Sequence, residues 1–148
     1  PREGNLEVTI LDKNPAALTY SKEMFSHKNL PIEGHWVNDT VGNFLKNDPQ
    51  PKYNIVEMVG LMDYFSDDKV IETFQQIREK LAPGGVLITG NIIPNSEQPF
   101  VTNAVGWKMQ YRTPLQFASL VTAAGFSANK LKIFTEPMEI HCVIIAGT

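Results

Sequence analysis

Residues 53–91 constrain the fold more than any other part of this sequence, because they read as a strand, a loop, a helix, a turn and a second strand. Residues 53–59 form a nearly continuous apolar run, as expected for a strand buried on both faces of a parallel sheet. Ser66 is placed to cap the helix, and residues 82–85 (Ala-Pro-Gly-Gly) are placed to end it before a strand at residues 86–89. Crossovers between parallel strands are almost always right-handed, so we expect ligands beyond the carboxyl ends of these strands.

Before this unit the sequence predicts two strands and two helices. Residues 6–11 alternate and are rich in β-branched residues, which indicates a strand. Asn14 is placed to cap the next helix, and Pro15 suits its first turn. Residues 34–37 then form a short strand, followed by a short helix that ends near residue 46.

After this unit the sequence predicts a long loop, a helix and a hairpin. Residues 92–112 show no clear period, and loops of this length in compact domains are often functional. Residues 113–116 (Thr-Pro-Leu-Gln) match a capping box that begins a helix. The last two strands, residues 130–135 and 139–146, are joined by a short turn, so they form an antiparallel hairpin.

The composition indicates one soluble globular domain. The chain has 148 residues, of which 43% are hydrophobic and 20% are charged, with a formal net charge of -3. This charge predicts no binding to nucleic acid or to an anionic membrane, and no apolar run is long enough to span a bilayer. Cys142 is the one cysteine, which excludes an internal disulfide and makes a cytoplasmic location the expectation.

The motifs resemble those of class I S-adenosylmethionine-dependent methyltransferases. The matching features are Gly-Leu-Met-Asp-Tyr-Phe-Ser-Asp-Asp at residues 60–68, the Leu-Ala-Pro-Gly-Gly helix end at 81–85, and the closing hairpin. With residues 107–112 they are most similar to bacterial small-molecule or fatty-acyl methyltransferases. The resemblance implies an α/β, Rossmann-like fold: a mostly parallel sheet with helices on both faces and a C-terminal antiparallel hairpin. It also implies methyl transfer from S-adenosylmethionine to a small-molecule or acyl acceptor.

One part of the family pattern has no counterpart in these residues. The family's glycine-rich loop follows a strand that precedes the one ending at Asp12, whereas only Gly4 stands upstream of Leu6. We therefore expect a single domain over residues 1–148 that lacks its first strand and helix. In the family sheet the missing strand lies between the strands that end at Asp12 and Val59. We expect an N-terminal segment, or a second copy in a homodimer, to fill that position, because unpaired strand edges are costly.

Four residues of the first half are candidate cofactor ligands. Asp12 ends the first strand, where a carboxylate offers two oxygens to the hydroxyl groups of a ribose. Lys13 follows it, and the alternative is a solvated turn aspartate beside this lysine. The resemblance implies that Asp39, with Thr40 beside it, lies near the adenine amino group of the cofactor. The alternative is that Asp39 caps the following helix.

Four residues of the 60–68 motif are candidates for the place where cofactor and acceptor meet. Gly60 permits close backbone approach, and Leu61 is expected to pack on the cofactor. Asp63 and Tyr64 are expected to bind the acceptor or to stabilise the positively charged sulfonium. The alternative for Tyr64 is an aromatic residue of the core.

Four further residues are candidate acceptor ligands. Asn91 lies at the end of the second strand of the central unit. Trp107 and Tyr111 are expected to exclude water, and Arg112 to pair with an acceptor carboxylate. The alternative for Arg112 is a local cap or ion pair.

Other classes of site are disfavoured. The three histidines and Cys142 lack metal-ligand spacing, since neighbours in a strand such as His141 and Cys142 point to opposite faces. Methyl transfer is a direct displacement that depends on positioning, so we assign no catalytic base. Two other functions stay open: a non-catalytic interaction module that keeps the fold, and an NAD-dependent Rossmann enzyme, against which the closing hairpin argues.

Overall fold

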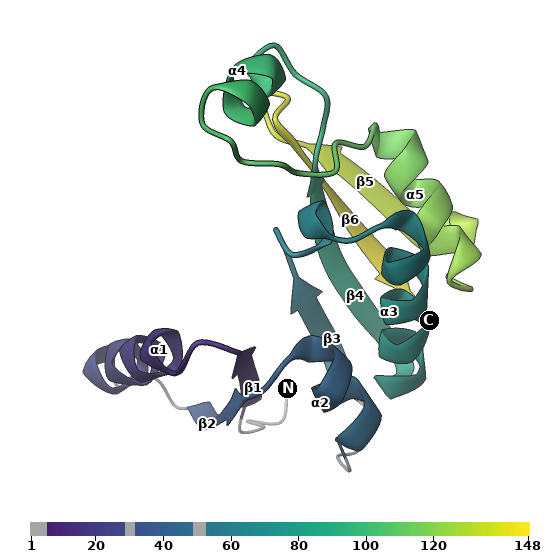
Figure 1. The fold of residues 1–148 in the computed structure, drawn as a ribbon. Coiled ribbons are helices and arrows are strands. Elements are labelled where there is room, and N and C mark those ends of the chain that lie inside the picture. The colour runs from purple at the N-terminus through teal and green to yellow at the C-terminus, as the bar shows by residue number, and fades with distance from the viewer. Residues whose placement is uncertain (1–5, 29–31, 49–52) are drawn as a thin grey trace. The chain divides into compact units, whose positions relative to one another are not determined.

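The computed structural model describes residues 6–28, 32–48 and 53–148, which form two compact units, Pro1–Pro49 and Gln50–Thr148. Each unit has its own sheet, a two-stranded one in the first and a four-stranded one in the second. The fold class is the expected α/β class (Figure 1). The first and third strands of the chain belong to different sheets, and the strand expected between them stays a prediction.

The first unit is a parallel strand pair with two helices. Strand β1 (Leu6–Asp12) pairs with β2 (Ile32–Asn38), and their last residues are opposite each other. Helix α1 (Pro15–Lys28) contacts both strands, and α2 (Val41–Asn47) follows β2. The second strand is longer at both ends than predicted. The sequence Asn29-Leu30-Pro31, at which we expect α1 to end, lies outside the described residues.

Helix caps in this unit follow the sequence closely. Asn14 Oδ1 accepts a hydrogen bond from the Ala16 amide at 2.9 Å, which confirms Asn14 as the cap of α1. For α2 the capping residue is Thr40, whose hydroxyl accepts from the Asn43 amide at 3.3 Å. The alternative role considered for Asp39, capping this helix, therefore belongs to its neighbour.

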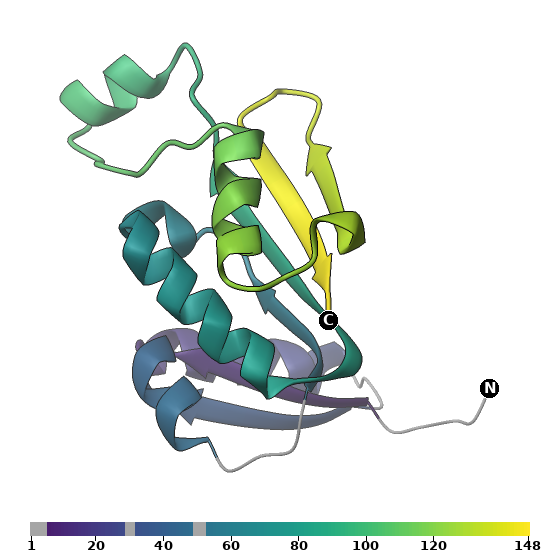
Figure 2. The same cartoon turned by 90° about the vertical axis from the view of Figure 1, so that its right-hand side faces the viewer.

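The second unit is built on the predicted crossover and hairpin. Its sheet has the order β3-β4-β6-β5, with β3 (Tyr53–Met58) parallel to β4 (Leu81–Ile92) and β6 (His141–Gly147) antiparallel to both β4 and β5 (Leu131–Thr135). Helices α3 (Asp67–Lys80) and α5 (Pro114–Ala123) lie on the same face of this sheet (Figure 2).

The core of the second unit lies between that sheet and its two helices. Phe74 of α3 and Phe117 of α5 are fully buried and meet edge to face, with ring centroids 6.0 Å apart. Leu87 of β4 and Ile144 of β6 close the core from the sheet side. The capping box at Thr113 is confirmed, because Thr113 and Gln116 each accept a hydrogen bond from the other's amide.

Two local expectations were wrong, and the one for Ser66 was right in position only. Residues 82–85 do not separate helix from strand, because β4 begins at Leu81 directly after α3. The Pro-Gly-Gly sequence lies within β4, where the pairing with β3 is irregular. Ser66 occupies the first position before α3, but its side chain makes no cap hydrogen bond. Residues 92–112 are not all loop, because they contain the short helix α4 (Gln98–Asn103). Two single turns of 3-10 helix, η1 (Met62–Tyr64) and η2 (Ala128–Lys130), complete the secondary structure.

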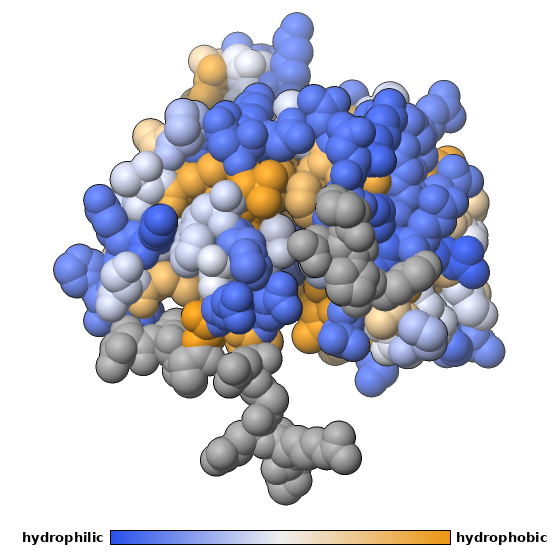
Figure 3. Space-filling view, turned by 90° about the horizontal axis from the view of Figure 1, so that it is seen from below, coloured by the Kyte–Doolittle hydropathy of each residue, from blue (hydrophilic) through white to orange (hydrophobic). Residues whose placement is uncertain are grey.

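On the face drawn in Figure 3, hydrophilic residues surround several apolar ones. In and after β3, for example, Ile55 and Val59 are 61% and 50% exposed. Within the described ranges, no helix has the length and apolar character needed to cross a membrane.

Candidate functional site

A cavity of about 320 Å³ opens in the second unit at the carboxyl ends of β3 and β4. Its walls come from four segments: the turn after β3, the chain after β4 including α4, the segment before α5, and the start of β6. The residues that line it are Gly60, Asp63, Tyr64, Ile92, Asn95, Glu97, Val101, Trp107, Met109, Tyr111, Ile140 and His141. Five of these, Gly60, Asp63, Tyr64, Trp107 and Tyr111, were predicted site residues, so the cavity gathers side chains from distant parts of the sequence.

Gly60 forms the edge of the cavity nearest β3. Its φ angle is 80°, in the left-handed region where glycine carries little strain, and no atom lies within 4 Å of the place where a Cβ would stand. The backbone at Gly60 is therefore accessible to a ligand. Leu61 begins the turn that follows, and it is not one of the lining residues.

Asp63 is the most buried acid of the cavity, with 4% of its surface exposed. Its Oδ1 atom accepts a hydrogen bond from the Ile92 amide at 2.8 Å, and its carbonyl oxygen accepts from the Gln110 amide at 2.7 Å. Burial raises the pKa of Asp63, and the Ile92 amide and the charges of His141 and Arg112 oppose that rise. The turn after β3 is thus fastened to both β4 and the segment before α5.

Two aromatic rings stand at the mouth of the cavity. Trp107 donates a hydrogen bond from Nε1 to the Tyr64 hydroxyl, with the two atoms 2.9 Å apart. Tyr64 is 51% exposed and Trp107 is 52% exposed, so the alternative of a core role for Tyr64 is wrong. Large exposed aromatic side chains that border a cavity are typical of ligand sites.

Tyr111 lies deeper in the same cavity. Its hydroxyl group is buried and has no hydrogen-bond partner among the described residues. A buried hydroxyl without a partner costs about 1–3 kcal/mol, which a ligand with a matching polar group would recover.

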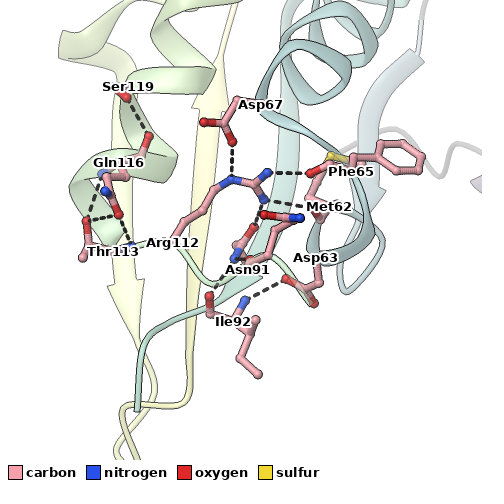
Figure 4. Close-up of polar contacts among 11 residues, drawn as sticks. Met62, Asp63, Phe65, Asp67, Asn91, Ile92, Arg112, Thr113, Gln116 and Ser119 are labelled. Carbon is pink, nitrogen blue, oxygen red and sulfur yellow. Dashed lines mark hydrogen bonds and ion pairs between the residues drawn. The ribbon is translucent and has the colours of Figure 1, made fainter. Parts of the chain in front are cut away.

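Arg112 and Asn91 do not line the cavity, and their polar contacts join neighbouring segments of the chain (Figure 4). Arg112 is 4% exposed and donates to Asp67 Oδ1, Asn91 Oδ1 and the carbonyl oxygens of Met62 and Phe65, over distances of 2.6–3.0 Å. Four of the five guanidinium N–H groups are therefore bound by the protein. The ion pair with Asp67 fits the alternative role for Arg112 in kind, but its partners are distant in the sequence and not local. Contact with the acceptor stays a prediction.

Asn91 links the same segments through its amide group. It is fully buried, and its Nδ2 atom donates to the carbonyl oxygens of Ile92 and Gln110 at 2.6 and 2.9 Å. Together with Arg112 it holds the turn after β3, the end of β4 and the segment before α5 in one arrangement. The two residues thus support the residues that face the cavity.

The predicted site residues of the first unit meet at the carboxyl edge of its strand pair. Asp12 and Asn38 are opposite each other, and Asn38 Nδ2 donates to the Asp12 carbonyl oxygen at 3.0 Å. Asp12 Oδ1 accepts from the Asn14 amide at 2.8 Å, and Asp39 Oδ1 accepts from the Thr40 amide at 2.7 Å. In each carboxylate the second oxygen accepts no hydrogen bond from the described residues, which suits a ligand with hydroxyl or amino groups. Lys13 follows directly at the same edge and is exposed.

Sequence reasoning missed the residues that close the cavity from α4 and from the hairpin. They are Ile92, Asn95, Glu97, Val101, Met109, Ile140 and His141. One signal was present, since Pro99 after Glu97 suits the first turn of a helix. No local sequence pattern predicts that Ile140 and His141 line the cavity. They reach it because β6 pairs with the end of β4.

Metal and thiol chemistry have no clear support at this site. No group of three or more His, Cys, Asp or Glu side chains within the described ranges is arranged to hold a metal ion. Cys142 is fully buried, and burial raises the pKa of its thiol. A thiol in that state is a poor nucleophile.

The fold is Rossmann-like α/β, and the cavity lies at the carboxyl edge of the sheet of the second unit. Comparison with solved structures specifies the class further: the chain has the fold of class I S-adenosylmethionine-dependent methyltransferases. No protein-family model and no curated protein sequence matches it.

Three solved structures illustrate the likeness. A possible exported protein from Bordetella parapertussis has 20% identity and a TM-score of 0.82, and the match covers 96% of this chain and 53% of that one. Human N-acetylserotonin methyltransferase in complex with S-adenosylmethionine has 19% identity and a TM-score of 0.67, and the match covers 96% of this chain and 40% of that one. Magnesium protoporphyrin IX methyltransferase from Synechocystis, with bound S-adenosylhomocysteine, has 11% identity and a TM-score of 0.70, and the match covers 97% of this chain and 64% of that one. The chain therefore spans 40–64% of the length of these proteins.

Proposed function

We propose that this chain is part of an enzyme that transfers a methyl group from S-adenosylmethionine to a small-molecule acceptor bound in the cavity of the second unit. The observation that carries the proposal is the cavity itself, which opens beside Gly60 at the carboxyl ends of two parallel strands in a methyltransferase fold. Ligands of open α/β sheets bind at that edge.

The residues at the strand ends fit such a cofactor. Asp12 and Asp39 each keep one carboxylate oxygen for hydroxyl or amino groups, and Lys13 and Thr40 stand beside them. In the second unit, the accessible backbone at Gly60 and the adjoining Leu61 are suited to its methionine or adenine portion. When bound, S-adenosylmethionine would supply an electrophilic methyl group on a positively charged sulfur.

The protein's contribution is positioning. The acceptor needs to be held in line with the methyl group, and such alignment is a large source of rate enhancement. Asp63, Tyr64, Trp107 and Tyr111 form the walls that would orient the acceptor and exclude water. Arg112 and Asn91 keep the wall segments fixed relative to one another.

Calorimetry on the intact protein with S-adenosylmethionine, and separately with NAD, tests the proposal. We expect binding of S-adenosylmethionine, and a loss of about 1.5–3 kcal/mol in the Asp12→Ala variant, as for a hydrogen bond to a charged group. Glu23→Ala is the matched control, because Glu23 is an exposed acid on α1 of the same unit. Binding of NAD alone would favour the nicotinamide enzyme, and binding of neither would favour the non-catalytic module.

A further inference from the structure

The cavity of the second unit combines aromatic walls with negative charge. Three of its lining residues are aromatic, namely Tyr64, Trp107 and Tyr111, and two are acids, Asp63 and Glu97. His141 also lines the cavity, and the lining residues include no lysine and no arginine. Arg112, which follows the lining residue Tyr111, is not among the lining residues and donates to four protein oxygens.

Neither acid forms an ion pair within the described part of the chain, although the charges of His141 and Arg112 act on Asp63. Glu97 begins α4, is exposed, and its carboxylate forms no hydrogen bond or ion pair with the described residues. Asp63 is buried, uses one oxygen for the Ile92 amide, and forms no ion pair within the described part of the chain. A buried carboxylate carries a desolvation cost, which the charges of His141 and Arg112 only partly offset at Asp63, and a positively charged ligand would lower that cost further.

The aromatic rings favour the same ligand charge. The faces of tryptophan and tyrosine attract cations, and aromatic walls with nearby carboxylates are a known arrangement for binding ammonium groups. The hydrogen bond between Trp107 and Tyr64 fixes both rings at the mouth of the cavity. The volume of about 320 Å³ suits a compact molecule with one or two rings.

We propose that the cavity binds a small organic cation, a protonated amine on an aromatic or similar apolar body, and discriminates against carboxylates. Asp63 and Glu97 supply the complementary charge, the three aromatic residues surround the apolar body, and the Tyr111 hydroxyl receives a hydrogen-bond partner. That this cation is the methyl acceptor rests on the proposed function, whereas its binding does not.

The test compares three probes of similar size and different charge: 2-phenylethylamine, 2-phenylethanol and phenylacetate. The sequence contains two tryptophans, so Trp36→Phe leaves Trp107 as the single fluorescent reporter in the cavity. Calorimetry on the unsubstituted protein repeats the comparison. We expect the amine to bind about tenfold more tightly than the alcohol, and phenylacetate to bind least.

Matched variants locate the charge effect. Glu97→Gln should reduce the preference for the amine about two- to fivefold and leave the affinity for the alcohol unchanged. Glu57→Gln removes the same charge from β3, outside the cavity, and should leave the preference intact. Glu97 is exposed, so its replacement leaves the core untouched.

Several results would overturn the proposal: equal affinity for amine and alcohol, tighter binding of phenylacetate, no measurable binding of the amine, or equal effects of the two glutamate variants. Displacement of the amine by S-adenosylmethionine but not by S-adenosylhomocysteine would assign the cation site to the cofactor's sulfonium and overturn it for the acceptor. A preference for the amine in a protein that fails to bind S-adenosylmethionine would retain this proposal and reject the proposed function.

Discussion

The two units of this chain differ in how much of their stability comes from a packed core. In the first unit, the described hydrophobic residues that are buried are Leu18 and Leu45. The second unit buries a continuous set between its sheet and its two helices, including Phe74, Phe117 and Ile144. A two-stranded sheet is only marginally stable in water, whereas a four-stranded sheet packed on helices can be stable by itself. The acids expected to bind cofactor thus lie on the weaker scaffold, and the cavity on the stronger one.

The largest difference between the units should appear when an aromatic side chain is truncated. Phe74→Ala removes a fully buried ring that packs on Phe117, and should lower the free energy of unfolding by about 3–5 kcal/mol. Tyr20→Ala on α1 removes a ring that is 65% exposed, and should change it by less than about 0.5 kcal/mol. Urea denaturation of both variants measures the difference. Equal losses would mean that the first unit has a core of comparable strength.

A smaller difference in the free energy of unfolding is expected when one cationic side chain of each unit is replaced by alanine. Arg112→Ala leaves two carbonyl oxygens and an amide oxygen of the second unit without a donor, and should cost about 2–4 kcal/mol. Lys22→Ala removes a cation 5.8 Å from the centre of the Trp36 ring on the first unit's surface, and should cost less than about 1 kcal/mol.

The same pair of variants tests whether Arg112 binds the acceptor. If it does, the lost contact with the acceptor adds to the lost support of the fold. The Michaelis constant for the acceptor then rises while the affinity for the cofactor is kept. Loss of stability with equal losses for both ligands would assign Arg112 to support of the fold.

Helix caps give a difference of about 1 kcal/mol. Thr113→Ala removes a capping box of α5 and should lower global stability by about that amount. Thr40→Ala removes the cap of the seven-residue helix α2. We expect its effect in faster hydrogen exchange of the first unit, with little change in the unfolding of the second. Similar effects of Thr40→Ala on exchange in both units would show that they unfold together.

The smallest expected effect concerns the pH dependence of the second unit. Burial raises the pKa of Asp63 above its ordinary value of 3.8, so the protonated form stabilises the fold. That contribution is complete below pH 3.8 and is lost as the pH rises through the pKa of the folded state. Asp63→Asn keeps an acceptor for the Ile92 amide and does not titrate. Its stability relative to the original protein should therefore improve as the pH rises.

Urea denaturation over a pH series measures this effect. His141, Arg112, Glu97 and Tyr111 face or adjoin the same cavity, and the charges of His141 and Arg112 act against the shift. Repeating the series in a His141→Gln background removes the charge of the histidine from the comparison. A constant difference between Asp63→Asn and the original protein would show that Asp63 titrates normally.

The sequence was sufficient for what is local and periodic. The crossover from β3 through α3 to β4, the capping box at Thr113 and the closing hairpin each depend on short patterns, and each was predicted. The start of β4 was not, because pairing with β3 overrides the turn preference of Pro-Gly-Gly. Of the residues that line the cavity, Gly60, Asp63 and Tyr64 were predicted from their position after a strand, and Trp107 and Tyr111 from the end of the long loop.

Two features of the site could not be predicted, because they depend on contacts between distant segments. The guanidinium of Arg112 finds four acceptors in three segments that meet only in the folded unit. His141 and Ile140 enter the cavity through the antiparallel register of β6 with β4. An arginine near aromatic residues has the same sequence pattern whether it faces a ligand or holds the backbone behind it.

Hydrogen exchange with and without S-adenosylmethionine tests the central claim most directly, namely that the ligand site lies at the carboxyl ends of β3 and β4. We predict slower exchange on addition of the cofactor at residues 60–64, and no change at residues 82–87 near the amino end of β4. Protection confined to the amino end of the strands, or no protection at residues 60–64 at a saturating concentration of cofactor, would contradict the account.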